Sequence, residues 1–339
     1  MMKMSNKQRT GKYIRFVLMF GVMLLLFGCT QVKDVEENHK IKVVTTIFPP
    51  YDFVRQIAGD NVEVTMLLKP GEETHSYEPT PQDILQIQQA DVFIYTGGEN
   101  DVWVEDILDS IHLEGKEMIA MVDCVETLEE EHVEGMKDER GHNHTLHDHE
   151  HEHEHEEEHE HTVDEHVWTS PQNAEKIVVD ISTVLQQKDK ENALLYKENT
   201  EKYLVQLKEL DEEFREVVEN SKNHVLLFGD RFPFRYFAEE YNLDYYAAFP
   251  GCASDTEPSA ATMAFLINQV KEKNIPVVLK MELSNDDISK AIAEATGTKV
   301  RTFYSCHNLT AKEFQAGETY LSMMRKNVET LKEVLGGWH

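Results

Sequence analysis

Basic residues are scarce in this chain, which carries 33 lysines and arginines against 63 aspartates and glutamates and has a formal net charge of −30. Beyond the extreme N-terminus the sequence has no basic cluster. Nucleic-acid binding depends on such clusters because they neutralise phosphates. The composition therefore excludes a nucleic acid as a partner, and it suits a soluble protein that attracts cations.

Long apolar runs are also missing, apart from one near the N-terminus. Basic residues from Lys3 to Arg15 precede an apolar run over 16–27, which has the shape of a secretory signal and is short for a permanent span. The run ends at Leu26-Phe27-Gly28-Cys29, which resembles a bacterial lipobox. We expect a lipoprotein signal peptide over 1–29, lipidation of Cys29, and a polar tether over 30–40. An uncleaved anchor is the alternative.

Cysteine is rare, and only Cys124, Cys252 and Cys306 remain beyond the predicted lipidation site. In an exported protein an even subset of cysteines tends to pair. Cys252 and Cys306 lie in the same half of the chain, each in a loop after a predicted strand. We expect a disulfide between them, and three buried free thiols are the alternative.

Strands and helices alternate through both halves of the chain. Apolar runs between turn and helix-start signals predict strands at 41–47, 62–68, 92–95, 118–122, 225–228, 245–249, 277–281 and 299–304. One helix start is strong, with Thr80 as N-cap, Pro81 at the first helical position and Asp83 at the third. Helices between successive strands predict an α/β fold with mostly parallel sheets and right-handed crossovers.

A long helix is expected between the two halves. Apolar residues from Leu195 to Phe214 recur at helical spacing among many charges and predict a helix over about 191–219. At about 1.5 Å per residue it spans roughly 43 Å, longer than one small domain is wide. We therefore expect a rigid strut between two lobes, and a surface helix of one domain is the alternative. The expected divisions are an N-terminal lobe over 41–170, linking helices over 171–222 and a C-terminal lobe over 223–339.

Histidine is concentrated in a His/Glu-rich loop over 126–163. Nine histidines occur within the twenty residues 142–161, interleaved with carboxylates and without apolar periodicity. Neutral imidazoles and carboxylates bind borderline divalent metals, so the loop is typical of metal contact. The alternative is a merely solvated charge run. The accessory metal residues we expect there are His142, His144, His147, His149, His151, His153, His155, His159 and His161.

Several polar residues outside this loop follow predicted strands or begin helices. In open parallel sheets, ligands bind beyond the carboxyl ends of the strands. Each residue alone is ordinary, because a loop histidine is seldom a ligand and a strand-end aspartate is as often a turn former. Their shared position at one edge makes them candidates as a group: His75, His166, Asp230, Glu282 and His307.

Two segments are similar to the zinc/manganese solute-binding proteins of ABC importers. The stretch from His75 to Asp83 reads His-Ser-Tyr-Glu-Pro-Thr-Pro-Gln-Asp and resembles the H-x-Y-E-P-T-P-x-D segment of that family. The stretch from Glu165 to Ala174 resembles its D-P-H-x-W-x-D-P-x-N-A segment, with a His-rich insertion upstream as in the zinc-specific branch. The resemblance covers the chain from Lys40 onward, and it implies two α/β lobes joined by a rigid helix, with a metal in the cleft between them.

The resemblance also implies a set of ligands. His75 and His166 match the two histidine ligands of the first lobe, while Asp230 stands where the family usually has a histidine or glutamate. His307 is the candidate fourth ligand near the last strand, with Cys306 as its competitor. Glu282 is either an alternative ligand or a residue that hydrogen-bonds one. Three histidines and one carboxylate suit zinc, whereas more carboxylate oxygens would favour manganese.

The function that this implies is a monomeric, lipid-anchored receptor on the extracytoplasmic face of a bacterial membrane. It would capture Zn(II) and deliver it to an ABC permease. The alternatives are a receptor for manganese or another divalent metal, a metal-binding adhesin, and a secreted zinc hydrolase. The sequence has no H-E-x-x-H motif, and four protein ligands would leave no position for a reactive water. We therefore predict that the protein is not an enzyme.

Overall fold

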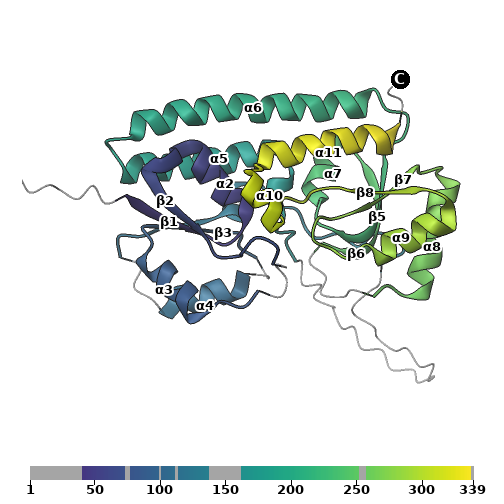
Figure 1. Ribbon diagram of the computed structural model, residues 1–339, viewed down its shortest axis with the longest axis horizontal. Coiled ribbons are helices and arrows are strands. Elements are labelled where there is room, and N and C mark those ends of the chain that lie inside the picture. Colours follow the sequence, from purple (N-terminus) through teal and green to yellow (C-terminus); the bar gives the residue numbers. More distant parts are fainter. Residues whose placement is uncertain are drawn as a thin grey trace, which may run out of the picture. The chain divides into compact units, whose positions relative to one another are not determined.

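The computed structural model describes residues 40–72, 77–98, 101–110, 114–136, 162–251 and 257–336 (Figure 1). The predicted signal peptide, almost all of the tether, His75, the repetitive histidines and Cys252 lie outside these residues. Within the described ranges, no helix is both long enough and apolar enough to cross a membrane.

The first sheet has four parallel strands in the order β2-β1-β3-β4. They are β1 (Ile41–Thr45), β2 (Val62–Met66), β3 (Val92–Tyr95) and β4 (Glu117–Ala120), connected by α2 (Phe48–Ala58), α3 (Pro81–Gln89) and α4 (Val102–Ser110). Helix α3 begins as predicted, because the Thr80 side chain accepts a hydrogen bond from the Asp83 N–H while Asp83 accepts one from the Thr80 N–H. Figure 1 shows α3 and α4 on the face of the sheet opposite α2.

The second sheet repeats this arrangement, with parallel strands in the order β6-β5-β7-β8. They are β5 (Val225–Phe232), β6 (Asp244–Pro250), β7 (Val277–Lys280) and β8 (Lys299–Thr302). The helices are α7 (Arg235–Tyr241), α8 (Ala260–Glu272), α9 (Asp287–Thr296), α10 (Ala311–Ala316) and α11 (Tyr320–Leu335). The predicted α/β fold with two mostly parallel sheets is confirmed. Helix α10 was not predicted, because six residues are too few for a clear helical period.

Strand β5 is longer than the sequence predicts. The expected strand ended at Phe228, with Asp230 in the loop after it, but the strand continues to Phe232 and all eight of its residues are buried. Its pairing with β6 is irregular between Phe228 and Arg231. Asp230 fits inside a strand because its carboxylate accepts hydrogen bonds from the Met281 N–H and the Ser284 hydroxyl. The prediction that Asp230 follows the strand is therefore wrong.

Two helices connect the sheets, α5 (Pro171–Lys188) and α6 (Ala193–Glu219). Figure 1 shows α6 running alongside α5 and α11. Near the middle of α6, Tyr203 lies 6.2 Å from Phe53 of α2 between ring centroids, and toward its C-terminal end Phe214 lies 4.9 Å from Phe237 of α7. Helix α6 therefore contacts the helices of both sheets, as expected of a linking helix.

One cluster of buried apolar side chains extends across both halves, and each half has a smaller cluster of its own. The shared cluster includes Val43 of β1, Leu207 of α6 and Phe228 of β5. The C-terminal segment also reaches the first half, where the Tyr320 N–H donates to the Asp52 carboxylate on α2. The two sheets are thus joined through a shared helical layer, and the exact division at 170 and 222 stays a prediction.

Candidate metal site

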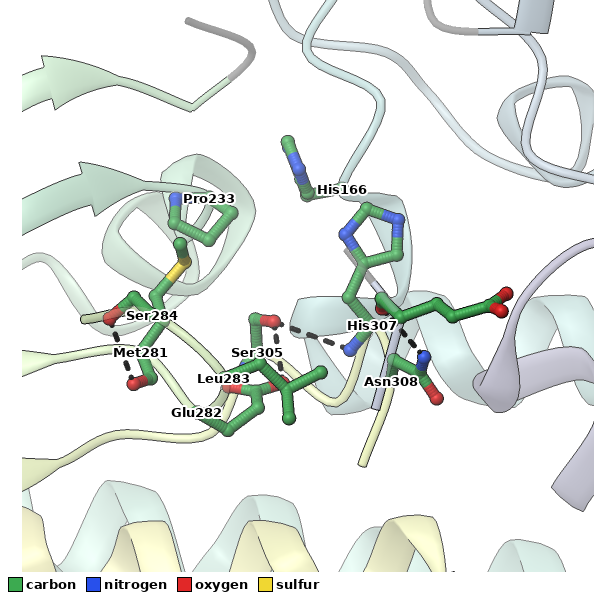
Figure 2. A pocket seen from close by; sticks show the side chains of 10 residues that line it. His166, Pro233, Met281, Glu282, Leu283, Ser284, Ser305, His307 and Asn308 are labelled. Atoms are coloured by element: carbon green, nitrogen blue, oxygen red, sulfur yellow. Dashed lines mark hydrogen bonds between the residues drawn. The ribbon is translucent and has the colours of Figure 1, made fainter. Parts of the chain in front are cut away.

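A small cavity of about 30 Å³ lies beyond the carboxyl ends of β7 and β8 (Figure 2). This volume suits one or two water-sized particles and therefore also a single metal ion. The residues around it come from both halves of the chain: Glu72, His166, Pro233, Met281, Glu282, Leu283, Ser284, Ser305, His307 and Asn308. Three of the candidates from the sequence, His166, Glu282 and His307, are brought together here.

His166 is buried, with 1% of its surface exposed, and is held by a nearby carboxylate. Asp164 Oδ1 lies 3.0 Å from the ring nitrogen Nδ1 and accepts a hydrogen bond of 2.9 Å from the His166 N–H. When Nδ1 donates its proton to Asp164, Nε2 is the nitrogen that carries a lone pair for a metal. Gly251 packs against this ring, since a Cβ at that position would lie 3.3 Å from His166 Cε1.

Burial and nearby charge act in opposite directions on His166. Burial lowers the pKa of the imidazole, but the adjacent Asp164 carboxylate, assisted by Glu165 and Glu130, outweighs it. The net result is a raised pKa, so this histidine holds a proton to a higher pH than an ordinary one.

His307 follows β8 and faces His166. The two ring centroids are 5.5 Å apart at an interplanar angle of 89°, and the His307 ring lies 4.9 Å from that of Trp168. Its backbone is fixed at both ends: the N–H donates to Ser305 Oγ, and the carbonyl accepts from the Phe48 N–H of α2. His307 is therefore placed by contacts with both halves of the chain.

Asn308 attaches the same loop to the segment that precedes His75. Its side-chain amide donates to the carbonyls of Lys69 and Glu72, at 2.8 and 2.9 Å. A second cavity of about 20 Å³ adjoins His307 and is lined in part by Tyr77, Trp103 and Glu165. Glu72 and Tyr77, the described residues on either side of the stretch 73–76, thus border two cavities that both have His307 in their lining.

Glu282 is a buried carboxylate directly after β7. Its Oε2 accepts a hydrogen bond of 2.7 Å from the Ser305 N–H, and its Oε1 accepts one of 2.8 Å from Ser305 Oγ. Burial raises the pKa of Glu282 to about 7, although the bonds from Ser305 oppose this shift. A carboxylate that is costly to ionise in a buried site is stabilised by a bound cation.

Two residues that border these groups have left-handed backbones. Leu283 has φ of 51° and Cys306 has φ of 60°, which is uncommon for residues other than glycine. Leu283 directly follows the candidate ligand Glu282. Cys306 directly follows Ser305, which is hydrogen-bonded to Glu282. Backbone strain of this kind is concentrated at binding and catalytic sites.

Cys306 does not line the cavity, unlike its neighbour His307. The thiol is free and lies within the apolar core cluster, where burial raises its pKa well above the ordinary value. A protonated thiol in an apolar environment is a poor metal ligand. A free thiol at Cys306 does not agree with the predicted disulfide to Cys252, because the thiol is buried in the apolar core cluster without a disulfide partner.

Asp230 is not brought into the cavity with the two histidines. Its carboxylate oxygens accept from the N–H groups of Arg231 and Met281 and from the Ser284 hydroxyl. These bonds connect β5 to the loop 281–284, which carries Glu282. Asp230 therefore stabilises the loop 281–284 and does not line the cavity.

The residues that hold the candidate ligands are harder to find in the sequence than the ligands themselves. Asp164, Ser305 and Asn308 were not predicted, and their one signal is that each lies within two residues of a candidate histidine. Among the described residues, no three histidine, cysteine or acidic side chains are grouped closely enough to hold a metal. His75 and the nine histidines of the accessory loop are not among those residues.

Curated proteins of similar sequence are zinc-binding proteins. AdcA of Streptococcus pyogenes serotype M3, a zinc-binding protein, is 33% identical over 332 residues, which cover 94% of this chain and 61% of AdcA. The chain therefore spans about 61% of that relative's length. The high-affinity zinc uptake system protein ZnuA of Bacillus subtilis is 32% identical over 331 residues, covering 96% of this chain and 98% of ZnuA.

Solved structures show the same fold. The metal-dependent lipoprotein YcdH from Bacillus subtilis superposes with a TM-score of 0.71 at 28% identity, covering 87% of this chain and 99% of YcdH. The Zn(II)-bound ZnuA-like domain of Streptococcus pneumoniae AdcA gives a TM-score of 0.68 at 28% identity over 87% of this chain and 99% of the domain. A family model described as zinc-uptake complex component A, periplasmic, matches residues 43–334. The chain, by this match and by its two-sheet fold, belongs to the family of the zinc-uptake complex component A proteins.

Proposed function

We propose that this chain is the extracytoplasmic receptor of a zinc importer of the ABC type. It binds Zn(II) as cargo and presents it to a membrane permease, and it has no catalytic role. One observation carries this proposal: His166 and His307, 141 positions apart in the sequence, face each other across a cavity that also contains the buried Glu282. The names of the zinc-binding relatives support zinc as the cargo.

The ligand set that we propose is His75, His166, His307 and Glu282. The three described members of this set are not grouped closely enough to hold a metal in this structure, so the proposal requires them to draw together when zinc binds. The first three are the histidines implied by the family resemblance, and Glu282 replaces Asp230 as the carboxylate because it lines the cavity and Asp230 does not. His75 is supported by its neighbours, since Glu72 borders one cavity and Tyr77 the other. Three imidazole nitrogens and one carboxylate oxygen match the tetrahedral coordination of zinc.

The remaining parts of the proposal concern the location of the protein. Export by the signal over 1–29 and lipidation of Cys29 would keep a monomeric receptor at the outer face of the membrane, beside its permease. The histidines over 142–161 would add weaker sites that raise the local zinc concentration. The Streptococcus pneumoniae relative, which is named a zinc-binding lipoprotein, supports the lipid anchor.

The proposed zinc site can be tested by calorimetry. The chain without its signal peptide is titrated with zinc. We expect one tight site besides weaker binding by the accessory loop. Replacing His75 with alanine is expected to remove the tight site and leave the weak binding, because a tetrahedral site with three remaining ligands loses both affinity and geometry. The matched control is His224→Ala, which replaces an exposed histidine directly before β5. An unchanged tight site in His75→Ala would overturn the proposed ligand set.

Zinc binding is expected to release protons at neutral pH. A ligating imidazole must be neutral and a ligating carboxylate ionised. His166 has a raised pKa and Glu282 has one of about 7, so the metal-free site holds protons at pH 7 that zinc must displace. Apparent affinity should therefore fall as the pH drops from 8 to 6. Titrations in two buffers of different ionisation enthalpy measure the protons released, and Asp164→Asn should reduce their number by lowering the pKa of His166.

A further inference from the structure

The His/Glu-rich loop is closed at its base by a short antiparallel pairing of residues 128–130 with residues 162–164. We call these six residues the stem. Glu129 and Val163 form an antiparallel bridge at its centre. Backbone hydrogen bonds of 2.8 and 2.9 Å lie on either side of this bridge. The stem thus holds together two segments that lie more than thirty positions apart in the sequence.

The segment that enters the stem passes from the first sheet to the second. It leaves β4 through the short 3₁₀ helix η4 (Met121–Cys124), whose Val122 N–H donates to the Thr96 carbonyl after β3. Beyond the stem, Gly135 packs directly on Phe265 of α8, since a Cβ at that position would lie 2.1 Å from an atom of the Phe265 ring. The stem therefore lies within a connection between the two halves that is separate from α5 and α6.

Tyr236 of α7 is hydrogen-bonded to both strands of the stem. Its side chain is buried, and its hydroxyl accepts a bond of 3.0 Å from the Leu128 N–H. The same hydroxyl donates its proton to the Asp164 carbonyl at 2.7 Å. A tyrosine hydroxyl has a single proton, so it serves here once as a donor and once as an acceptor. Because a buried polar group without a partner is costly, removing this hydroxyl should weaken both strands together.

Glu131 makes a second contact between this segment and the second half. Its carboxylate accepts a hydrogen bond of 3.1 Å from the Tyr245 hydroxyl of β6 and lies 3.2 Å from Arg235 Nε of α7. The Glu131 side chain is 48% exposed, so solvent screens this ion pair. The buried hydroxyl of Tyr236 is therefore expected to contribute more to the attachment than Glu131 does.

We propose that the stem is a strap, fastened by the Tyr236 hydroxyl, that attaches the chain leaving the first sheet to α7 of the second. The contacts that hold it come from residues outside 137–161. The strap should therefore stay closed whatever the composition of that stretch and whatever cations it carries. It adds a connection between the two halves to those made by α5 and α6.

Amide hydrogen exchange of the chain without its signal peptide, after metal is removed with a chelator, tests the strap. Tyr236→Phe keeps the aromatic ring and removes both hydrogen bonds of the hydroxyl. We expect the amides of Glu130 and Asp164, which donate across the stem, to exchange about tenfold faster or more. The melting temperature should fall by about 2–4 °C.

Tyr241→Phe is the matched control. Tyr241 also lies on α7 and is buried, but its hydroxyl donates to the Asp211 carboxylate of α6 at 2.9 Å. This variant should also lower the melting temperature, while the two stem amides exchange as in the unmodified chain. Stem amides that are unaffected in Tyr236→Phe, or equally accelerated in Tyr241→Phe, would overturn the proposal.

A chain in which residues 137–161 are replaced by glycine and serine at equal length tests the independence of the strap. We expect its stem amides to exchange as in the unmodified chain. Faster exchange there would also contradict the proposal, because the replaced residues would then be needed to close the stem. None of these measurements involves zinc, so their outcome is independent of the proposed function.

Discussion

Replacing His307 with alanine is expected to remove tight zinc binding. The loss should exceed the roughly 10–100-fold that follows from removing a partner of a ligand, because a ligand itself is lost. Only His166 and Glu282 would then remain among the candidates that line the cavity. The side chain of His307 is partly exposed, so we expect the metal-free variant to unfold at nearly the same temperature as the unmodified chain. Calorimetric titration gives the affinity, and thermal unfolding without zinc gives the stability.

Cys306→Ala is the matched comparison for this experiment. Cys306 is adjacent in sequence, but its thiol lies in the core and does not line the cavity. We expect this variant to keep tight zinc binding while losing some stability from the buried side chain. If Cys306→Ala loses zinc and His307→Ala keeps it, the assignment of the ligand in this loop is reversed.

Replacing Trp168 with alanine is expected to produce the largest loss of stability, about 3–5 kcal/mol in the free energy of unfolding. Trp168 is fully buried, and its ring lies 5.6 Å from that of His166 and 4.9 Å from that of His307. Its Nε1–H is also the donor to the Ser305 carbonyl. The substitution therefore leaves a cavity and removes the packing that keeps both histidines in place. Urea unfolding measures the first effect, and zinc titration of the folded variant measures the second.

Two further substitutions separate packing from hydrogen bonding at this position. Trp168→Phe keeps most of the volume and removes the donor, so the loss should be smaller, about 1–3 kcal/mol. Trp103→Ala removes a tryptophan that is only partly buried, beside the second cavity. A loss at Trp103 that equals the loss at Trp168 would show that the central packing has no special importance.

The fold could be predicted well because its local signals agree with its tertiary structure. The start of α3 at Thr80 and Pro81 is determined by a capping box that depends only on neighbouring residues. The end of β5 could not be predicted in the same way. Its last residues include Asp230 and Arg231, which look like loop residues until partners distant in the sequence, such as Met281, satisfy the buried carboxylate.

The sequence named both histidines that line the cavity, whereas Asp230, its first choice of carboxylate, does not line it. His166 and His307 stand beside elements that the periodicity identifies, so their positions at the sheet edge follow from the fold. The choice between Asp230 and Glu282 depends on which carboxylate faces the cavity. Only the three-dimensional arrangement separates the two.

The shared apolar cluster has a consequence for how the two halves relate to each other. Val43, Leu207 and Phe228 belong to one interior, and Tyr320 near the C-terminus is hydrogen-bonded to Asp52 near the start of the first half. This cluster is shared by the two halves, so a fragment cut between α6 and β5 would expose apolar surface that the whole chain covers. A wide hinge motion would expose the same surface. The cargo is therefore expected to enter and leave through rearrangement of the loops around His307, while the two sheets keep their mutual orientation.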